Sequence, residues 1–352
     1  MPDWKLSMQQ TFEYYTVDPG TWRDVKKLDT VKKCTITRDS SAETLGSATI
    51  DINEYVGECY IRIYLVTIQN GIKERFPLGT FLVQTPSSNF DGRVLSTTMD
   101  AYTPLLELKE NPPPLGYSIL KGDNIMQIAT QIVRDNARAP IVGTSNTTNL
   151  YNDFVANTND TWLTFTSDLI SNAKYKFALD ELGRILFAPI QEIDSLQPVW
   201  EYNSGNSSIL QPSIDIKHDM YGIPNVVEVV YSSGRDTYHV EVVNDDENSP
   251  VSTVSRGRKI RRVITDPGFA GEASEAMVRE YAEKALKELS TLSYTVSYTH
   301  GYCPVRLGDC VRLKYPASGI PEVKAEVISQ SINCEPGCQV DETAKFTMKL
   351  WR

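Results

Sequence analysis

Apolar and polar residues alternate toward both ends of this chain, whereas the apolar residues of its middle recur with the period of a helix. A period of two places neighbouring side chains on opposite faces of a strand, and a period of about 3.6 builds the apolar stripe of an amphipathic helix. One element cannot follow both periods. The sequence therefore predicts two β-rich regions separated by a region that contains helices.

The first β-rich region is predicted over residues 1–112. Its most apolar stretch, residues 59–68, is rich in β-branched and aromatic side chains and suits a central strand. Asn70-Gly71 follows it and is a strong hairpin signal. Further strands are predicted at residues 30–37, 48–52, 78–84 and 94–99, a spacing typical of a sandwich or barrel. The prolines at 112–114 end the region because they cannot donate to a strand ladder.

Residues 113–204 are predicted to form a small α+β insert domain. Apolar residues at 125, 128, 129, 132 and 133 form one helical stripe. Asp123 or Asn124 can cap that helix. A second helix is predicted to begin near Asp160, and it leads into a β-hairpin with its turn at residues 180–183.

The second β-rich region is predicted over residues 205–352, with one embedded helix at about 272–289. Strands are predicted at 226–231, 238–243, 293–299, 310–315, 325–331 and 344–351. The chain is thus expected to be mainly β with an α+β insert. No convincing sequence repeat relates the two β-rich regions.

The composition excludes several classes of protein. With 352 residues, 41% hydrophobic and 23% charged, the chain resembles ordinary globular proteins of two or three domains, not a disordered polymer, a collagen or a coiled coil. The N-terminus does not read as a signal peptide, and no apolar stretch approaches the ~18 residues that span a bilayer. Six cysteines are too few for a disulfide scaffold, so folding in a reducing cytoplasm is expected.

The charge balance argues against general DNA binding. Lys and Arg number 35 against 45 Asp and Glu, a net charge of −10, and phosphate binding needs an excess of cations. The one basic run, residues 256–262, has no interleaved aromatic residues that could stack bases. We expect it to be a strand edge that docks on an acidic neighbour.

No catalytic residues are predicted. The three histidines, His218, His239 and His300, have no evident Ser or Cys nucleophile arrangement nearby, and we expect structural or surface roles for them. No pair of carboxylates is marked for glycoside hydrolysis, and no glycine-rich segment has the Lys-Ser/Thr of a phosphate-binding loop.

No metal or other cofactor is predicted either. Cys303, Cys310, Cys334 and Cys338 could together supply four thiolates, but the spacing of the first pair is too wide for a usual structural zinc site. We expect core and turn roles for these cysteines, while their state (free, bridged or metal-bound) stays open. The acidic residues 244–248 lack the glycine and the final glutamate of an EF-hand loop.

Four groups of segments carry a resemblance to a known family. They are residues 76–83 with 95–102, residues 162–190, residues 224–229 with 248–258, and residues 272–289 with 300–313. In this order they resemble the hub proteins of the tails and baseplates of tailed bacteriophages and related contractile injection systems. No single segment is specific, and their order carries the resemblance.

The resemblance implies two β-barrel domains like the tail-tube subunit, so a homotrimer would present six barrels. Such a trimeric structural hub joins the hexameric tail tube to a central spike at the tail tip or baseplate of the virion, after assembly in the host cytoplasm. Other baseplate proteins and the tape measure protein are expected contacts. DNA would pass through during genome ejection without specific binding, and an acidic lumen would favour this. Because the sequence stops after the second predicted barrel, the spike or lysin is expected to be a separate polypeptide.

Two other functions stay open at this point. A tail-associated peptidoglycan hydrolase would use carboxylates that the sequence does not mark. A carbohydrate-binding tail module would use Trp4, Trp22 or Trp200 as sugar platforms.

Overall fold

The computed structural model describes residues 2–205, 208–218, 220–232, 237–265, 267 and 274–349. The chain forms two compact units, one of Met1–Ile214 with Tyr298–Thr343 and one of Asp215–Ser297 with Ala344–Arg352. The predicted mainly β fold with an α+β insert is confirmed. The compact units do not follow the predicted boundaries at 112 and 204, and the three-domain division stays a prediction.

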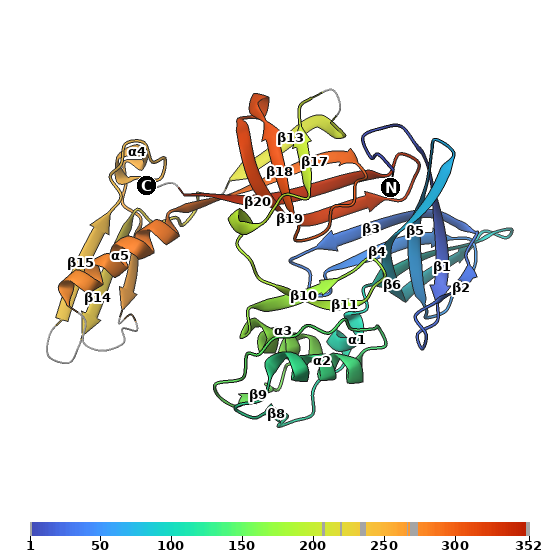
Figure 1. The fold of residues 1–352 in the computed structure, drawn as a ribbon, viewed down its shortest axis with the longest axis horizontal. Coiled ribbons are helices and arrows are strands. Elements are labelled where there is room, and N and C mark those ends of the chain that lie inside the picture. The colour runs from blue at the N-terminus through green and yellow to red at the C-terminus, as the bar shows by residue number, and fades with distance from the viewer. Residues whose placement is uncertain are drawn as a thin grey trace. The chain divides into compact units, whose positions relative to one another are not determined.

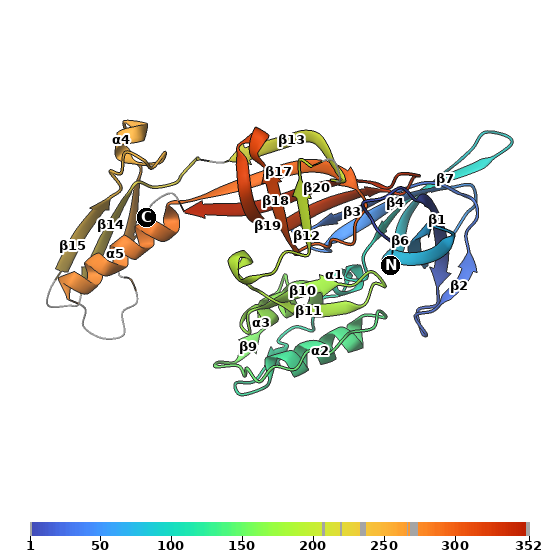
Figure 2. The same ribbon diagram turned by 45° about the horizontal axis from the view of Figure 1, so that its top comes forward.

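Seven strands form the first β-rich region. They are β1 (Gln9–Val17), β2 (Asp24–Lys27), β3 (Val31–Asp39), β4 (Gly46–Ile52), β5 (Tyr60–Gln69), β6 (Ile72–Phe90) and β7 (Leu95–Tyr102). The predicted central strand is β5, which pairs with β1 and β6 and whose first eight residues are buried. Asn70 and Gly71 both have positive φ, as the tight turn between β5 and β6 requires. Figure 2 shows the tip of the β6–β7 hairpin projecting from the sheet.

The insert contains both predicted helices and the predicted hairpin. Its elements are α1 (Leu106–Glu110), β8 (Ser118–Ile119), α2 (Ile125–Asn136), β9 (Phe154–Val155), α3 (Trp162–Ser171), β10 (Tyr175–Leu179), β11 (Ile185–Pro189) and the 3₁₀ helix η1 (Ile193–Ser195). Asn124 caps α2 by accepting from the Gln127 N–H at 3.0 Å, and Thr161 caps α3. The helices lie beside the β10–β11 hairpin and share one apolar core with it (Figure 1).

The remaining strands of the large sheet come from later in the chain. They are β12 (Trp200–Asn203), β13 (Leu210–His218), β17 (Thr291–Gly301), β18 (Cys310–Tyr315), β19 (Ile320–Asn333) and β20 (Gln339–Lys349), with the 3₁₀ helix η2 (Pro316–Ser318) before β19. The division between the compact units falls inside β13, β17 and β20.

The strand order places the early and late strands in one sheet. Among the described residues it runs β13-β17-β20-β19-β3-β4-β7-β6-β5-β1-β2, with β18 paired to β19 and β12 to β18. The antiparallel ladder between β19 and β3 joins the C-terminal strands to the N-terminal ones. This path is open at both ends and the described strands form no closed barrel, so the tube-like character of the two regions stays a prediction.

The second unit contains a smaller sheet covered by a helix. Its strands are β14 (Val226–Ser232), β15 (Thr237–Val243) and β16 (Arg261–Thr265), in the order β15-β14-β16. The helix α5 (Glu275–Leu289) packs Val278, Ala282 and Leu286 against this sheet, and a short helix α4 (Thr253–Arg256) precedes β16. The predicted helix is thus confirmed from 275 onward. Residues 272–273, like 350–351 of the predicted last strand, lie outside the described residues.

No helix in the described part of the chain is long and apolar enough to cross a membrane.

Candidate functional site

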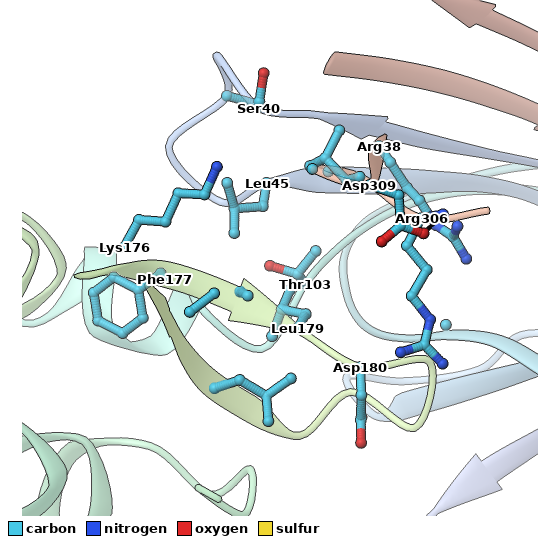
Figure 3. Close-up of a pocket in the computed structure, with 18 of the residues that line it drawn as sticks. Arg38, Ser40, Leu45, Thr103, Lys176, Phe177, Leu179, Asp180, Arg306 and Asp309 are labelled. Atoms are coloured by element: carbon cyan, nitrogen blue, oxygen red, sulfur yellow. Dashed lines mark hydrogen bonds between the residues drawn. The ribbon is translucent and has the colours of Figure 1, made fainter. Parts of the chain in front are cut away.

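A cavity of about 700 Å³ lies between the insert and the large sheet, within the first unit (Figure 3). Lys176, Phe177 and Leu179 of β10 line one side, and Leu45 and the loop with Arg306 and Asp309 line another. Sequence reasoning missed this cavity because its walls come from segments more than 100 residues apart. Its position between two sub-structures is common for ligand or partner sites.

Two ion pairs beside this cavity join the insert hairpin to strand β19 and to the loop that precedes β18. Lys176 Nζ lies 3.1 Å from Glu326 Oε1, and Arg306 pairs with Glu181 at the hairpin turn. Figure 3 shows Arg306 extending toward that turn. Both cations are about half exposed, so each pair contributes only ~0–1 kcal/mol.

A stronger contact holds the hairpin turn to the N-terminal strands. The Leu182 carbonyl accepts hydrogen bonds from Trp22 Nε1 at 2.8 Å, Thr80 Oγ1 at 2.9 Å and Arg62 Nη2 at 3.2 Å. Arg62 is itself buried and pairs with Asp24 at 2.9 Å. The next residue is Gly183 with φ +74°, where a Cβ would lie 2.6 Å from Thr80 Cβ. Only glycine fits this turn without displacing Thr80.

The core of the same unit contains a polar cluster made of Tyr202, Tyr298, His300, Cys303 and Glu342, which we call the His300 cluster. His300 Nε2 lies 3.4 Å from Glu342 Oε2 and 3.1 Å from Tyr202 Oη. Tyr298 donates to Glu342 at 2.6 Å. Tyr202 Oη lies 3.2 Å from Cys303 Sγ. All five side chains are buried, so these contacts replace their lost hydration.

Two residues extend the His300 cluster toward β3. Gln330 Nε2 donates to Glu342 at 2.6 Å, and its amide oxygen accepts from Arg38 Nη1 at 2.9 Å. The side-chain network therefore connects β20, β19 and β3, the strands that unite the two β-rich regions.

Burial and side-chain contacts have opposite effects on the pKa of His300. Burial alone would lower its pKa, but the contacts with Cys303 and Glu342 outweigh this and raise the pKa to about 10. Burial, followed by the Glu342 charge, raises the pKa of Tyr202 and of Tyr298 well above the usual range. The raised pKa favours the protonated, imidazolium form of His300 at neutral pH.

Cys303, His300 and Glu342 have the side-chain types of a catalytic nucleophile, base and acid. The sequence analysis did not predict this arrangement. Cys303 Sγ lies 4.0 Å from His300 Nδ1, but that nitrogen bonds the Gly301 carbonyl at 2.7 Å. The thiol is only 2% exposed and His300 is fully buried, so no substrate can reach them in this conformation. The spacing His300-Gly-Tyr-Cys303 was the one available signal.

The four C-terminal cysteines do not gather at one site. Cys303 lies in the His300 cluster, Cys310 begins β18, and Cys334 and Cys338 flank a turn beside Cys34 of β3. All six cysteines are free thiols. Across the described ranges no group of three or more His, Cys, Asp or Glu side chains is placed to hold a metal ion.

The basic run finds its partners within the second unit. Arg256 donates to the carbonyls of Met220 at 2.9 Å and Ile223 at 3.1 Å. Lys259 and Arg261 pair with Glu241 at 3.2 and 3.0 Å, which agrees with the predicted strand edge against an acidic neighbour.

The other two histidines also lie in the second unit. His239 pairs with Glu228, and His218 packs against Tyr294 with ring centroids 5.4 Å apart.

The three tryptophans considered as sugar platforms make contacts within the protein. Trp4 is buried and contacts Phe76 and Tyr302 edge-on, with ring centroids 5.1 Å apart in both cases. Trp22 binds the Leu182 carbonyl and packs on Tyr60. Lys5 lies over the half-buried Trp200 ring at 5.7 Å.

The sequence matches no protein-family model and no curated protein sequence. Solved structures are similar to it in fold. The tail protein from Neisseria meningitidis MC58 is similar over 97% of this chain and 98% of its own, with a TM-score of 0.62 and 12% identity. The 43 kDa tail protein of prophage MuSo2 from Shewanella oneidensis covers 95% and 97%, with a TM-score of 0.61 and 10% identity.

A third similar structure comes from a PdpA–VgrG complex. It covers 96% of this chain but 65% of its own, with a TM-score of 0.55 and 8% identity. At such identities the likeness concerns the fold alone. It includes both β-rich regions and the insert, and it confirms the resemblance inferred from the sequence: this chain has the fold of phage tail proteins.

Proposed function

We propose that this chain is a structural hub of a phage tail tip or baseplate. One observation carries the proposal: the fold is similar to two tail proteins, one of them from a prophage, over at least 95% of this chain and 97% of theirs. A likeness of this extent includes the order of all three regions, which a chance match of one β-sheet would not.

In finer detail, the hub would be a homotrimer that joins the hexameric tail tube to a central spike and forms part of the DNA conduit. Each chain would supply two tube-like units, so three chains match six tube subunits. The net charge of −10 supports passage of DNA without binding, because like charges repel. Tube, spike, tape measure and other baseplate proteins would be its partners in the virion tail, after assembly in the host cytoplasm.

We further propose that the role is structural and not enzymatic. The Cys303–His300–Glu342 arrangement, which has the order of catalytic groups, is sealed from solvent. A hydrolase acting on peptidoglycan needs its acid and base in an open cleft that accepts a polymer.

Native mass spectrometry and electron microscopy test this proposal. The purified chain is expected to form a species of three times its 39.5 kDa mass and to bind the end of assembled tail tubes. In a Gly183→Ala variant the added Cβ would collide with Thr80 and displace the insert turn. This variant is expected to bind tubes less well than a Gly71→Ala control, whose added Cβ meets no atom within 4 Å. A monomer that never joins tubes, or clearing of cell walls in a zymogram, would contradict the proposal.

A further inference from the structure

Two buried cysteines face each other at the end of the ladder between β3 and β19. The register pairs Thr35 with Asn333. One step further, the Cys334 N–H donates to the Cys34 carbonyl at 3.0 Å. Cys34 and Cys334 therefore lie opposite each other on two antiparallel strands.

The Cys34 and Cys334 side chains lie on the same face of the ladder as another pair of opposite residues that are in contact. Four residues along each strand, and on the same face, Arg38 Nη1 donates to Gln330 Oε1 across the strands at 2.9 Å. Cys34 is 0% exposed and Cys334 6%. Contact with the Cys34 thiol, together with burial, raises the pKa of Cys334 well above its usual range, as expected for two neighbouring thiols without water between them.

Backbone geometry permits a covalent bond at this position. Opposite residues of an antiparallel ladder have Cα atoms about 4.5–5.5 Å apart, and disulfides span about 4.4–6.8 Å. We propose that Cys34 and Cys334 form an intramolecular disulfide when the folded protein meets an oxidant of the peroxide class. Hydrogen peroxide takes one proton and one electron from each thiol. The Sγ–Sγ bond forms as the O–O bond breaks, and two water molecules leave.

The position of this bond gives it a large mechanical effect. Cys34 and Cys334 are 300 positions apart in the sequence, and they extend the ladder that joins the N-terminal strands to the C-terminal ones. Closing so long a loop removes much freedom from the unfolded chain. The disulfide would therefore resist separation of the two β-rich regions.

Cys338 is the competing partner. It is buried in the turn that follows Cys334, with a φ of +35°, and the Cys334 thiol contributes to its raised pKa. A disulfide between Cys334 and Cys338 would close only a short turn and would leave β3 unlinked.

The rate of bond formation should depend on pH. The thiolate is the reacting form, and few Cys334 thiols are ionised at neutral pH because the contact with Cys34 and burial raise the pKa of Cys334. Oxidation is therefore expected to accelerate as the pH rises from 7 toward 9.

Peptide mapping of the full chain tests the proposal. The native protein is treated with hydrogen peroxide, quenched, and digested without reductant. We expect two of the six thiols to be lost, a cross-linked peptide whose fragments assign Cys34 to Cys334, and a melting temperature about 5 °C higher that a reductant restores.

Matched serine variants sharpen the test. Cys338→Ser should keep the cross-link, and Cys34→Ser should lose it; the map of the unsubstituted chain decides the matter if either variant fails to fold. A link between Cys334 and Cys338, further oxidation to sulfinic acid without a link, or retention of all six thiols in the native protein would overturn the proposal.

Discussion

Two histidine–carboxylate pairs, one in each compact unit, show how burial changes what the same contact does. In the first unit, His300 and Glu342 lie 3.4 Å apart and both side chains are inaccessible to water. In the second unit, His239 bonds Glu228 on the sheet surface, and the histidine side chain is 58% exposed.

The surroundings of the two pairs differ accordingly. Glu342 also accepts hydrogen bonds from Tyr298 and Gln330, so it is the common partner of the buried network. Glu228 has its pKa lowered by the bond to His239 and by the Arg261 charge, but water and salt screen these contacts. Loss of the buried pair leaves polar groups without hydrogen-bond partners in the core, whereas water can replace either member of the exposed pair.

The largest effect is expected from Glu342→Ala. The substitution leaves His300, Tyr298 and Gln330 without their partner in the core, and breaking a buried pair costs about 3–5 kcal/mol. Denaturant unfolding followed by tryptophan fluorescence measures it, because four of the five tryptophans lie in the first unit. Glu342→Gln, which keeps the shape of the side chain, serves as the milder control. A change below 1 kcal/mol would show that the cluster is not sealed.

The second effect concerns pH. The pKa of His300 rises from 6.5 in the unfolded chain to about 10 in the fold, so its stabilisation is complete below pH 6.5 and is lost as the pH rises toward 10. Between pH 6.5 and 8.5 the unfolding free energy should fall by about 2–3 kcal/mol through His300 alone. Unfolded thiols, whose pKa is about 8.5, add to this fall only near the upper end of the window. A His300→Gln variant should show a flatter pH profile, and equal slopes would refute the assignment.

A smaller effect is expected from Tyr298→Phe. It removes one hydrogen bond of 2.6 Å to the Glu342 carboxylate but retains the ring that packs on Tyr202. Hydrogen bonds to charged groups contribute about 1.5–3 kcal/mol, and the same unfolding assay measures this loss. If the variant were as stable as the parent, Glu342 would have to find another donor in the core.

The smallest effect is expected from His239→Gln. Because the pair with Glu228 is solvated, circular dichroism should show no measurable shift in the thermal midpoint of the protein. A loss comparable to that of Tyr298→Phe would mean that the surface of this sheet is covered in the assembled molecule, and the contrast between the two pairs would fail.

Local pattern sufficed for much of the fold. The alternation around Cys34 and Ile36, the stripe of α2 and the turn at Asn70-Gly71 all carry their own signal, since each depends on neighbours in the chain. The helix α5 was predictable for the same reason. Such elements need no information about distant segments.

The His300 cluster and the other sites could not be predicted, because they depend on the register of strand pairing, which local sequence patterns do not reveal. Tyr202 and His300 are 98 positions apart, and Arg38 and Gln330 are 292 apart. A shift of one residue in any of these ladders would turn the side chains to the other face. His300 and Cys303 were visible as a pair, but only pairing of β17 with β20 brings Glu342 to them.

The contact at the Leu182 carbonyl has a consequence for how this fold can vary. A backbone oxygen is present whatever amino acid stands at position 182, so drift in that side chain leaves the three incoming hydrogen bonds intact. The orientation of the insert is therefore encoded outside it, by Trp22, Thr80 and Arg62. An insert of foreign sequence could be grafted between the same strands and still be held in this orientation, provided that its hairpin keeps a glycine after the accepting carbonyl.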